Sequence, residues 1–197
     1  MRTGRPRTFD MDAALAKALR VFWSKGYEGA SMADLTEAMG INRPSLYAAF
    51  GNKEGLFRKA LDLYTGGPYP TSIAALEEPT ARAAAEALLR STAELSTDPS
   101  TPPGCLLVHG ALVVGDASEA MRKELASRRE GVLGAVERRF QRALEDGDLP
   151  ADTDPADLAR FVMAVSNGIA VHAAGGADRE ELQRTVVTAM RAWPAGD

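Results

Sequence analysis

Four polar side chains near residue 45 have the types and spacing that recognition of a nucleic acid needs. Asn42, Arg43, Ser45 and Tyr47 lie within six residues. An arginine guanidinium can donate two parallel hydrogen bonds to a guanine edge, and amides and hydroxyls can bond base edges or phosphate oxygens. Lys53, six residues beyond Tyr47, adds a cation that suits a phosphate. The group therefore predicts contact with DNA.

Two short helices joined by a glycine turn are predicted to position these side chains. Ser31 is a good helix cap ahead of an apolar-periodic stretch at 32–39, and Gly40 ends that stretch. Asn42 then begins a helix over about 43–49, with Pro44 tolerated in its first turn. This order predicts a helix-turn-helix, whose second helix presents its first residues to the major groove.

Helical periodicity continues on both sides of this motif, and we find no alternating strand pattern. A helix is expected over 11–25, ended by Gly26, and another over 53–64, while residues 1–9 form a basic arm. After a linker at Gly66-Gly67-Pro68, helices are expected at 71–77, 80–96, 104–115, 118–146, 154–174 and 178–192. We therefore predict an all-α protein with a three-helix DNA-binding domain over 1–66 and a second helical domain over 67–197.

Charge is distributed unevenly along the chain. The 197 residues carry a formal net charge of −4. Residues 1–65 contain ten Lys and Arg against seven Asp and Glu, a balance of +3, whereas the remainder has a balance of −7. This distribution argues against a protein that coats DNA along its whole surface, and it favours contact through the first domain alone.

Composition also limits the chemistry of the chain. Cys105 is the one cysteine, so no intramolecular disulfide can form, and the longest apolar run is shorter than the about 20 residues of a membrane span. We expect a cytoplasmic protein. With two distant histidines and no Gly-x-Ser-x-Gly, Walker or dinucleotide-binding pattern, we expect no metal, no cofactor and no catalytic residues.

Residues 14–57 resemble the DNA-binding domain of the TetR/AcrR family of regulators. The resemblance is carried by Phe22, Gly26, Ser31, Gly40, Leu46, Tyr47, Phe50, Lys53, Leu56 and Phe57. It implies a homodimeric repressor that binds a palindromic operator and leaves it when a small molecule binds the second domain. The open alternatives are an enzyme that carries a helical domain and a regulator whose second domain binds a protein.

The resemblance also implies roles for single residues. Arg43 is expected to read a base, Pro44 to touch a thymine methyl and Ser45 to contact a base edge or a phosphate. The expected DNA-binding residues are Ser31, Met32, Asn42, Arg43, Pro44, Ser45, Tyr47, Lys53, Arg5 and Arg7. Tyr47 could instead be a core residue, and the arginines of the arm could be a tail without a specific role. Ala48 and Ala49 stand where many family members have longer polar side chains, so the base-reading surface is expected to be narrow.

The second domain offers weaker signals. Polar or polarisable side chains within apolar stretches are candidates for an effector site, namely Cys105, His109, Met163, Asn167 and His172. Apolar residues of the last two helices are candidates for a dimer interface, namely Phe161, Val165, Ile169, Val186 and Met190. The alternatives are a structural histidine at 109, a purely intramolecular core for the apolar set, and either a reactive thiol or a small buried hydrophobe at Cys105.

Overall fold

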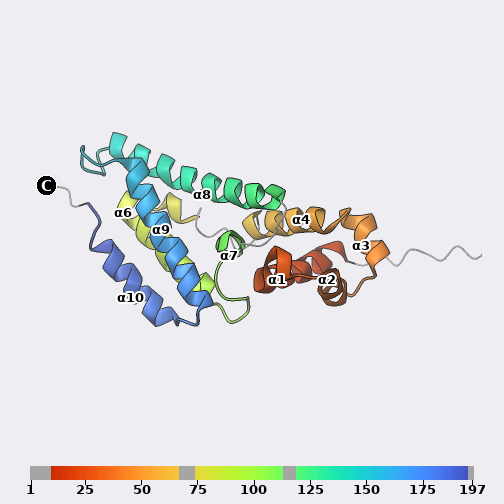
Figure 1. Ribbon diagram of the computed structural model, residues 1–197. Coiled ribbons are helices and arrows are strands. Elements are labelled where there is room, and N and C mark those ends of the chain that lie inside the picture. Colours follow the sequence, from red (N-terminus) through yellow and green to blue (C-terminus); the bar gives the residue numbers. More distant parts are fainter. Residues whose placement is uncertain (1–9, 67–73, 113–118, 195–197) are drawn as a thin grey trace, which may run out of the picture. The chain divides into compact units, whose positions relative to one another are not determined.

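The computed structural model describes residues 10–66, 74–112 and 119–194 (Figure 1). The chain divides into two compact units, Met1–Gly67 and Pro68–Asp197. Helices make up all the regular structure of the described ranges, which confirms the predicted all-α fold. None of these helices is long and apolar enough to cross a membrane.

Four helices build the first unit: α1 (Met11–Gly29), α2 (Met32–Met39), α3 (Arg43–Phe50) and α4 (Lys53–Gly66). α1 packs against α2 and α4, and the centre of this packing is aromatic. The rings of Phe22 and Phe57 meet edge to face with centroids 4.9 Å apart, and those of Trp23 and Tyr64 do the same at 4.9 Å. A small unit thus obtains a rigid core from a few large side chains.

Side-chain caps explain where the helices of the first unit begin. Asp10 accepts hydrogen bonds from the backbone N–H groups of Asp12 and Ala13. Asn42 accepts one from Ser45 N at 2.9 Å, and Asn52 accepts one from Gly55 N at 2.7 Å. Each cap satisfies a donor that the first turn of a helix leaves without an intrahelical partner.

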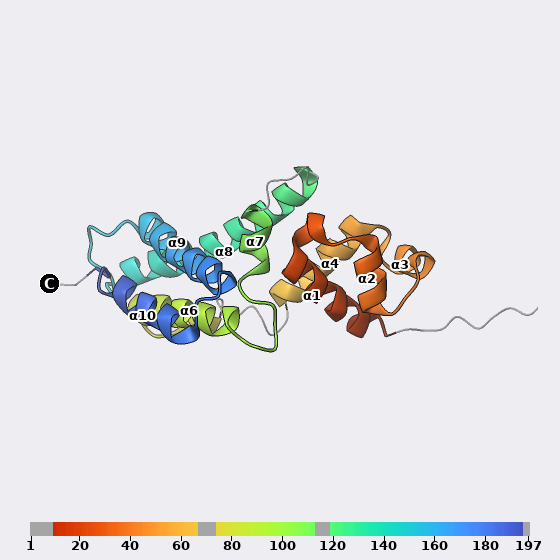
Figure 2. The same cartoon turned by 60° about the horizontal axis from the view of Figure 1, so that its bottom comes forward.

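The elements formed by the described residues of the second unit are a short 3₁₀ helix and five α-helices. They are η1 (Ala75–Glu77), α6 (Ala81–Ser96), α7 (Leu106–Leu112), α8 (Glu119–Glu145), α9 (Pro155–Ala174) and α10 (Arg179–Met190). α9 packs against α6, α8 and α10, and Figure 2 shows α6, α9 and α10 side by side. Their buried side chains form one continuous core that includes Leu88, Phe140, Val162 and Trp193.

A buried arginine secures the start of this unit. Arg139 of α8 is only 7% exposed. Its guanidinium donates to the carbonyl oxygens of Leu76 at 2.9 Å, Glu78 at 2.9 Å and Pro79 at 3.3 Å. The carboxylate of Asp148 accepts the backbone N–H of Ala81, the first residue of α6. We call this set of contacts the 76–81 clamp.

Two predicted helices fall only partly within the described residues. In the stretch predicted as helix at 71–77, residues 71–73 lie outside the described ranges, Ala74 is helical and 75–77 form the 3₁₀ turn η1. The helix predicted from 104 begins at Leu106, because Gly104 has a φ of +83° and cannot belong to a right-handed helix. Residues 113–115 of that prediction lie outside the described ranges.

Candidate nucleic-acid interface

The N-terminal half of α3 exposes the side chains expected to read bases. Asn42, Arg43 and Pro44 are exposed and Ser45 is partly buried. Leu46 is fully buried and Phe50 nearly so, and they hold the opposite side of the helix against the first unit. α3 therefore has an apolar inner face and a polar outer face, as the predicted motif requires.

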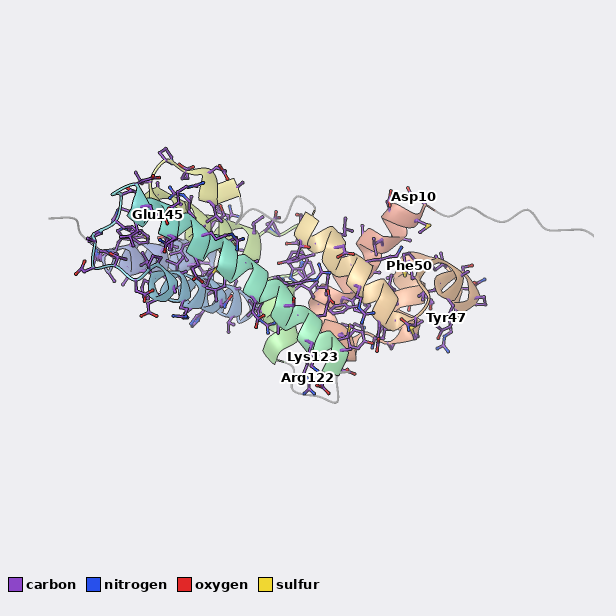
Figure 3. The ribbon with its side chains drawn as sticks, turned by 90° about the horizontal axis from the view of Figure 1, so that it is seen from above. Asp10, Tyr47, Phe50, Arg122, Lys123 and Glu145 are labelled. Atoms are coloured by element: carbon purple, nitrogen blue, oxygen red, sulfur yellow. The ribbon has the colours of Figure 1, made fainter. Side chains whose placement is uncertain are left out.

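Tyr47 belongs to the outer face of α3. Its side chain is 48% exposed, so it is not a core residue. In Figure 3 it projects away from the ribbon, whereas Phe50 lies among the helices. A phenol in this position can donate a hydrogen bond to a phosphate oxygen. Arg5 and Arg7, expected to enter the minor groove or lie along the backbone of DNA, lie outside the described residues.

A carboxylate of the chain itself occupies the start of α2. Asp34 Oδ2 accepts hydrogen bonds from Ser31 N at 2.9 Å and Ser31 Oγ at 2.8 Å, while Asp34 N donates to Ser31 Oγ at 3.1 Å. Asp34 Oδ1 pairs with Lys25 Nζ at 2.7 Å. Hydrogen bonds from Lys25 and Ser31 lower the pKa of the Asp34 carboxyl to about 2.

Lys25 lies beside the start of α2, and the sequence analysis did not identify it as a candidate DNA-binding residue. Ser31, and with it Met32 as the first residue of α2, was expected to offer a phosphate site, yet the Ser31 hydroxyl already donates to Asp34. The exposed cation beside this helix start is Lys25, whose side chain is 48% exposed. The capping box of Ser31 and Asp34 is visible in the sequence, but the approach of Lys25 depends on how α1 packs on α2.

Lys53 begins α4 and lies over an aromatic ring. Its Nζ is 4.5 Å from the centroid of Tyr27. Burial lowers the pKa of the Lys53 ammonium, and the nearby carboxylate of Glu28 acts in the opposite direction. Burial also raises the pKa of the Tyr27 phenol, and Glu54 and Glu28 add to that rise. The expected phosphate-binding cation is thus partly buried and already in contact with the protein.

The candidate effector residues lie on α7 and α9 or just before α7. Cys105, His109, Met163 and Asn167 are partly buried, and His172 is exposed. The imidazole of His109 packs closely on Gly104, where an added Cβ would lie 2.5 Å from Nε2 and 2.9 Å from the carbonyl oxygen of Ala170. The contact explains why a glycine stands there.

A pocket of about 430 Å³ lies elsewhere in the second unit. It is formed by the loop after α6 and the turn between α9 and α10, with Ser96, Thr101, Ala173 and Arg179 among its lining residues. None of the five candidate effector residues lines it. This pocket could not be predicted from the sequence, because it depends on the packing of a proline-rich loop against a turn far along the chain.

The candidate interface residues separate into two groups. Ile169, Val186 and Met190 are 1%, 0% and 5% exposed and lie inside the core of the second unit, so they have no surface left for a partner. This corrects their expected role, because the apolar side of each helix is already buried within the subunit. Val165 is partly buried against the same core. Phe161 is 40% exposed and can meet a second chain.

Comparison with protein families assigns both units. The family model described as "Bacterial regulatory proteins, tetR family" matches residues 14–60. The model described as "Tetracyclin repressor-like, C-terminal domain" matches residues 82–190.

Relatives of known name and structure extend along most of the chain. It is 36% identical over 193 residues to the HTH-type transcriptional repressor ComR of Escherichia coli strain K12, which covers 97% of this chain and 92% of that protein. A cysteine-substituted form of the TetR family transcriptional regulator CifR, solved with 26-bp operator DNA, has 48% identity and a TM-score of 0.92 over 96% of this chain and all of that one. A TetR regulator from Rhodococcus sp. RHA1 has 43% identity and a TM-score of 0.65 over 95% of this chain and 100% of its own.

Proposed function

The chain belongs to the TetR family of bacterial regulatory proteins, and from this membership we propose that it is a transcriptional repressor that binds a palindromic operator as a homodimer. The observation that carries the proposal is the exposed start of α3, where Arg43 and Pro44 face outward from a helix anchored by buried Leu46. A relative that spans nearly the whole chain is named a repressor, and another was solved on operator DNA.

Arg43 is the proposed base reader. A guanidinium at the first turn of the recognition helix can donate two hydrogen bonds to guanine O6 and N7. Ser45 and Pro44 would add one polar and one apolar contact. Ala48 is exposed on the same helix and offers no hydrogen bond, so specificity rests on few contacts.

The test is operator selection from a random DNA library with the purified full-length protein. We expect a palindrome whose half-sites are about one helical turn apart, with an affinity that falls as salt rises. Arg43→Ala should relax base preference at one position in each half-site and cost about 1–3 kcal/mol per contact. If the wild-type protein showed no sequence-selective, salt-sensitive binding to DNA, the proposal would be wrong.

Exposed apolar residues of the last two helices support the homodimer. Phe161 and Val171 of α9 are each 40% exposed, and Val187 of α10 is 45% exposed. Gly168 lies in the same helix as the first two, and among the described residues no atom outside the neighbouring backbone of α9 lies within 4 Å of an added Cβ. A glycine inside a helix costs roughly 0.5–1 kcal/mol relative to alanine, so close approach of a second chain is a physical reason for it.

For the effector, we propose a small molecule bound among side chains of α7 and α9. His109 and Asn167 offer polar atoms within apolar surroundings, and α7 and α9 are in contact. The variants His109→Phe and Asn167→Leu should lose induction by any effector found in a metabolite screen while keeping operator binding. Arg160→Ala, a change at an exposed residue of α9 outside the candidate set, is the matched control, and equal loss in all three would contradict this placement.

The compartment and the absence of catalysis follow from the same proposal. A protein that controls bacterial transcription acts where the chromosome is, which is the cytoplasm. No catalytic role is needed, since binding and release of the operator carry the whole function. Turnover of the effector by the purified protein would contradict this part of the proposal.

A further inference from the structure

Tyr27 packs where α1 meets α4 in the first unit. It follows Gly26, whose φ of 70° and ψ of 175° form a combination that only glycine adopts without strain. The Tyr27 ring stacks on Phe22 with centroids 6.3 Å apart and lies 5.0 Å from the ring of Phe57. Its place is therefore set by the backbone on one side and by the aromatic core on the other.

The exposed side of this ring carries Lys53. The Nζ atom lies 4.5 Å from the ring centroid, within the range of a cation–π contact. Another lysine of the same helix, Lys59, lies 5.8 Å from the ring of Phe50 and is exposed. Of these two lysines, Lys53 has the closer ring and the partly buried side chain.

A free lysine has many rotamers, and binding a phosphate requires one of them. Ordering such a side chain at an interface costs roughly 0.5–1.5 kcal/mol, a two- to tenfold loss of affinity. The Tyr27 ring holds the Lys53 ammonium in one place before DNA arrives. The same contact removes water from one side of the ammonium, so that side need not be desolvated again on binding.

We propose that Tyr27 is a positioning residue for DNA binding: its ring holds the Lys53 ammonium extended at the start of α4, ready for a backbone phosphate of the operator. The inference rests on the proposed function as a DNA-binding repressor. Tyr27 itself need not touch DNA. The ring, not the hydroxyl, carries the effect.

The first measurement is made on the free protein. Nuclear magnetic resonance of the Lys53 ε-methylene protons should give an upfield ring-current shift in the wild type and in Tyr27→Phe, and a normal shift in Tyr27→Leu. A normal shift in the wild type would overturn the inference without any reference to DNA.

The second measurement is operator affinity over a series of salt concentrations. Tyr27→Phe should stay within about twofold of the wild type, and Tyr27→Leu should bind about 4- to 100-fold more weakly, because two subunits each lose a pre-ordered lysine. Lys53→Gln should bind more weakly still and reduce the salt slope by about one per subunit. Lys59→Gln removes the same charge from the same helix and is the matched control, with an expected change smaller than that of Lys53→Gln.

A double variant separates positioning from general support of the fold. If Tyr27 acts through Lys53, Tyr27→Leu should add nothing in the Lys53→Gln background. Losses that multiply would overturn the inference and leave the proposed function intact. Failure of the wild type to bind any operator would overturn both.

Pentafluorophenylalanine at position 27 covers the case in which Tyr27→Leu does not fold. It keeps the shape of the ring but inverts its charge distribution, so it should weaken operator binding as Tyr27→Leu would. Binding at the wild-type level with this residue would overturn the role of the ring.

Discussion

Asp34 shows how a single carboxylate can organise the start of a recognition motif. It closes the capping box with Ser31 and holds Lys25 at 2.7 Å, so it connects the end of α1 with the beginning of α2. Since α2 supports α3 through the turn at Gly40, the geometry of the exposed arginine depends indirectly on this group. The carboxylate also reduces the positive field where a phosphate would lie.

The contribution of Asp34 to stability should depend on pH. Its pKa in the folded protein, about 2, is below the ordinary value of 3.8, so the charged carboxylate stabilises the fold above about pH 4 and this contribution is lost as the pH falls towards 2. We expect Asp34→Asn to lower the Tm at pH 7 and to melt like the wild type near pH 2. Glu37→Gln, at an exposed acidic residue of α2, is the control. The difference between its Tm and that of the wild type should not shrink between pH 7 and pH 2.

Arg139 provides a second prediction at the scale of one residue. Arg139→Met keeps much of the side-chain volume but leaves the carbonyl oxygens of Leu76, Glu78 and Pro79 without their donor. We expect a loss of about 1–3 kcal/mol in the free energy of unfolding, measured with urea. Arg142→Met, at an exposed site one turn along α8, should change it by less than about 0.5 kcal/mol. Equal effects would mean that the buried bonds do not matter.

Among the elements, helix beginnings were the most predictable feature. Ser31 and Asn42 were recognisable as caps because their side chains act on the backbone three residues ahead, an interaction that the local sequence contains. Gly40 was likewise recognisable as the end of α2 and has positive φ. Gly26, expected to end the first helix, instead lies at a kink inside α1 (Met11–Gly29), with a φ of 70°. These short-range rules were sufficient for the helix-turn-helix.

The partners of apolar helix faces could not be predicted in the same way. Periodicity identified Ile169, Val186 and Met190 as apolar, but it cannot say whether such a face meets the same chain or another. In the structure all three are buried in the core of their own subunit. The Lys53–Tyr27 contact was missed for a related reason, because it joins residues whose neighbourhood is created by the packing of α1 on α4.

Gly55 supports a prediction about how α4 begins. A Cβ at this position would lie 2.3 Å from the carbonyl oxygen of Phe50, so backbone would have to move. We expect Gly55→Ala to destabilise the protein by more than 1 kcal/mol and to weaken operator binding, because the start of α4 carries Lys53. In Gly131→Ala, on an exposed part of α8 with open space around the added methyl, stability should instead rise by roughly 0.4–1 kcal/mol. Thermal denaturation of both variants decides between these outcomes.

At the scale of the whole molecule, the proposed dimer should respond to charge on the exposed side of α9 and α10. Phe161→Glu and Val187→Glu place a carboxylate at sites 40% and 45% exposed, so the subunit itself should fold normally. Sedimentation should show a shift to monomer, and operator affinity should fall about a hundredfold or more, because two linked half-site contacts become independent. Gln141→Glu adds the same charge at an exposed position of α8 and should remain dimeric. If all three variants remained dimeric, the dimer interface would have to lie elsewhere on the subunit.

The 76–81 clamp has a consequence for the order in which the protein is made. Its anchors lie far downstream: Arg139 comes 63 positions after Leu76, and Asp148 comes 67 positions after Ala81. A ribosome releases the chain from its N-terminus, so the whole first unit emerges, with all the partners its core needs, before either anchor has been translated. The first unit can therefore fold while residues 76–81 of the second unit still have no partners. The 76–81 clamp forms only after α8 and the loop that follows it have left the ribosome.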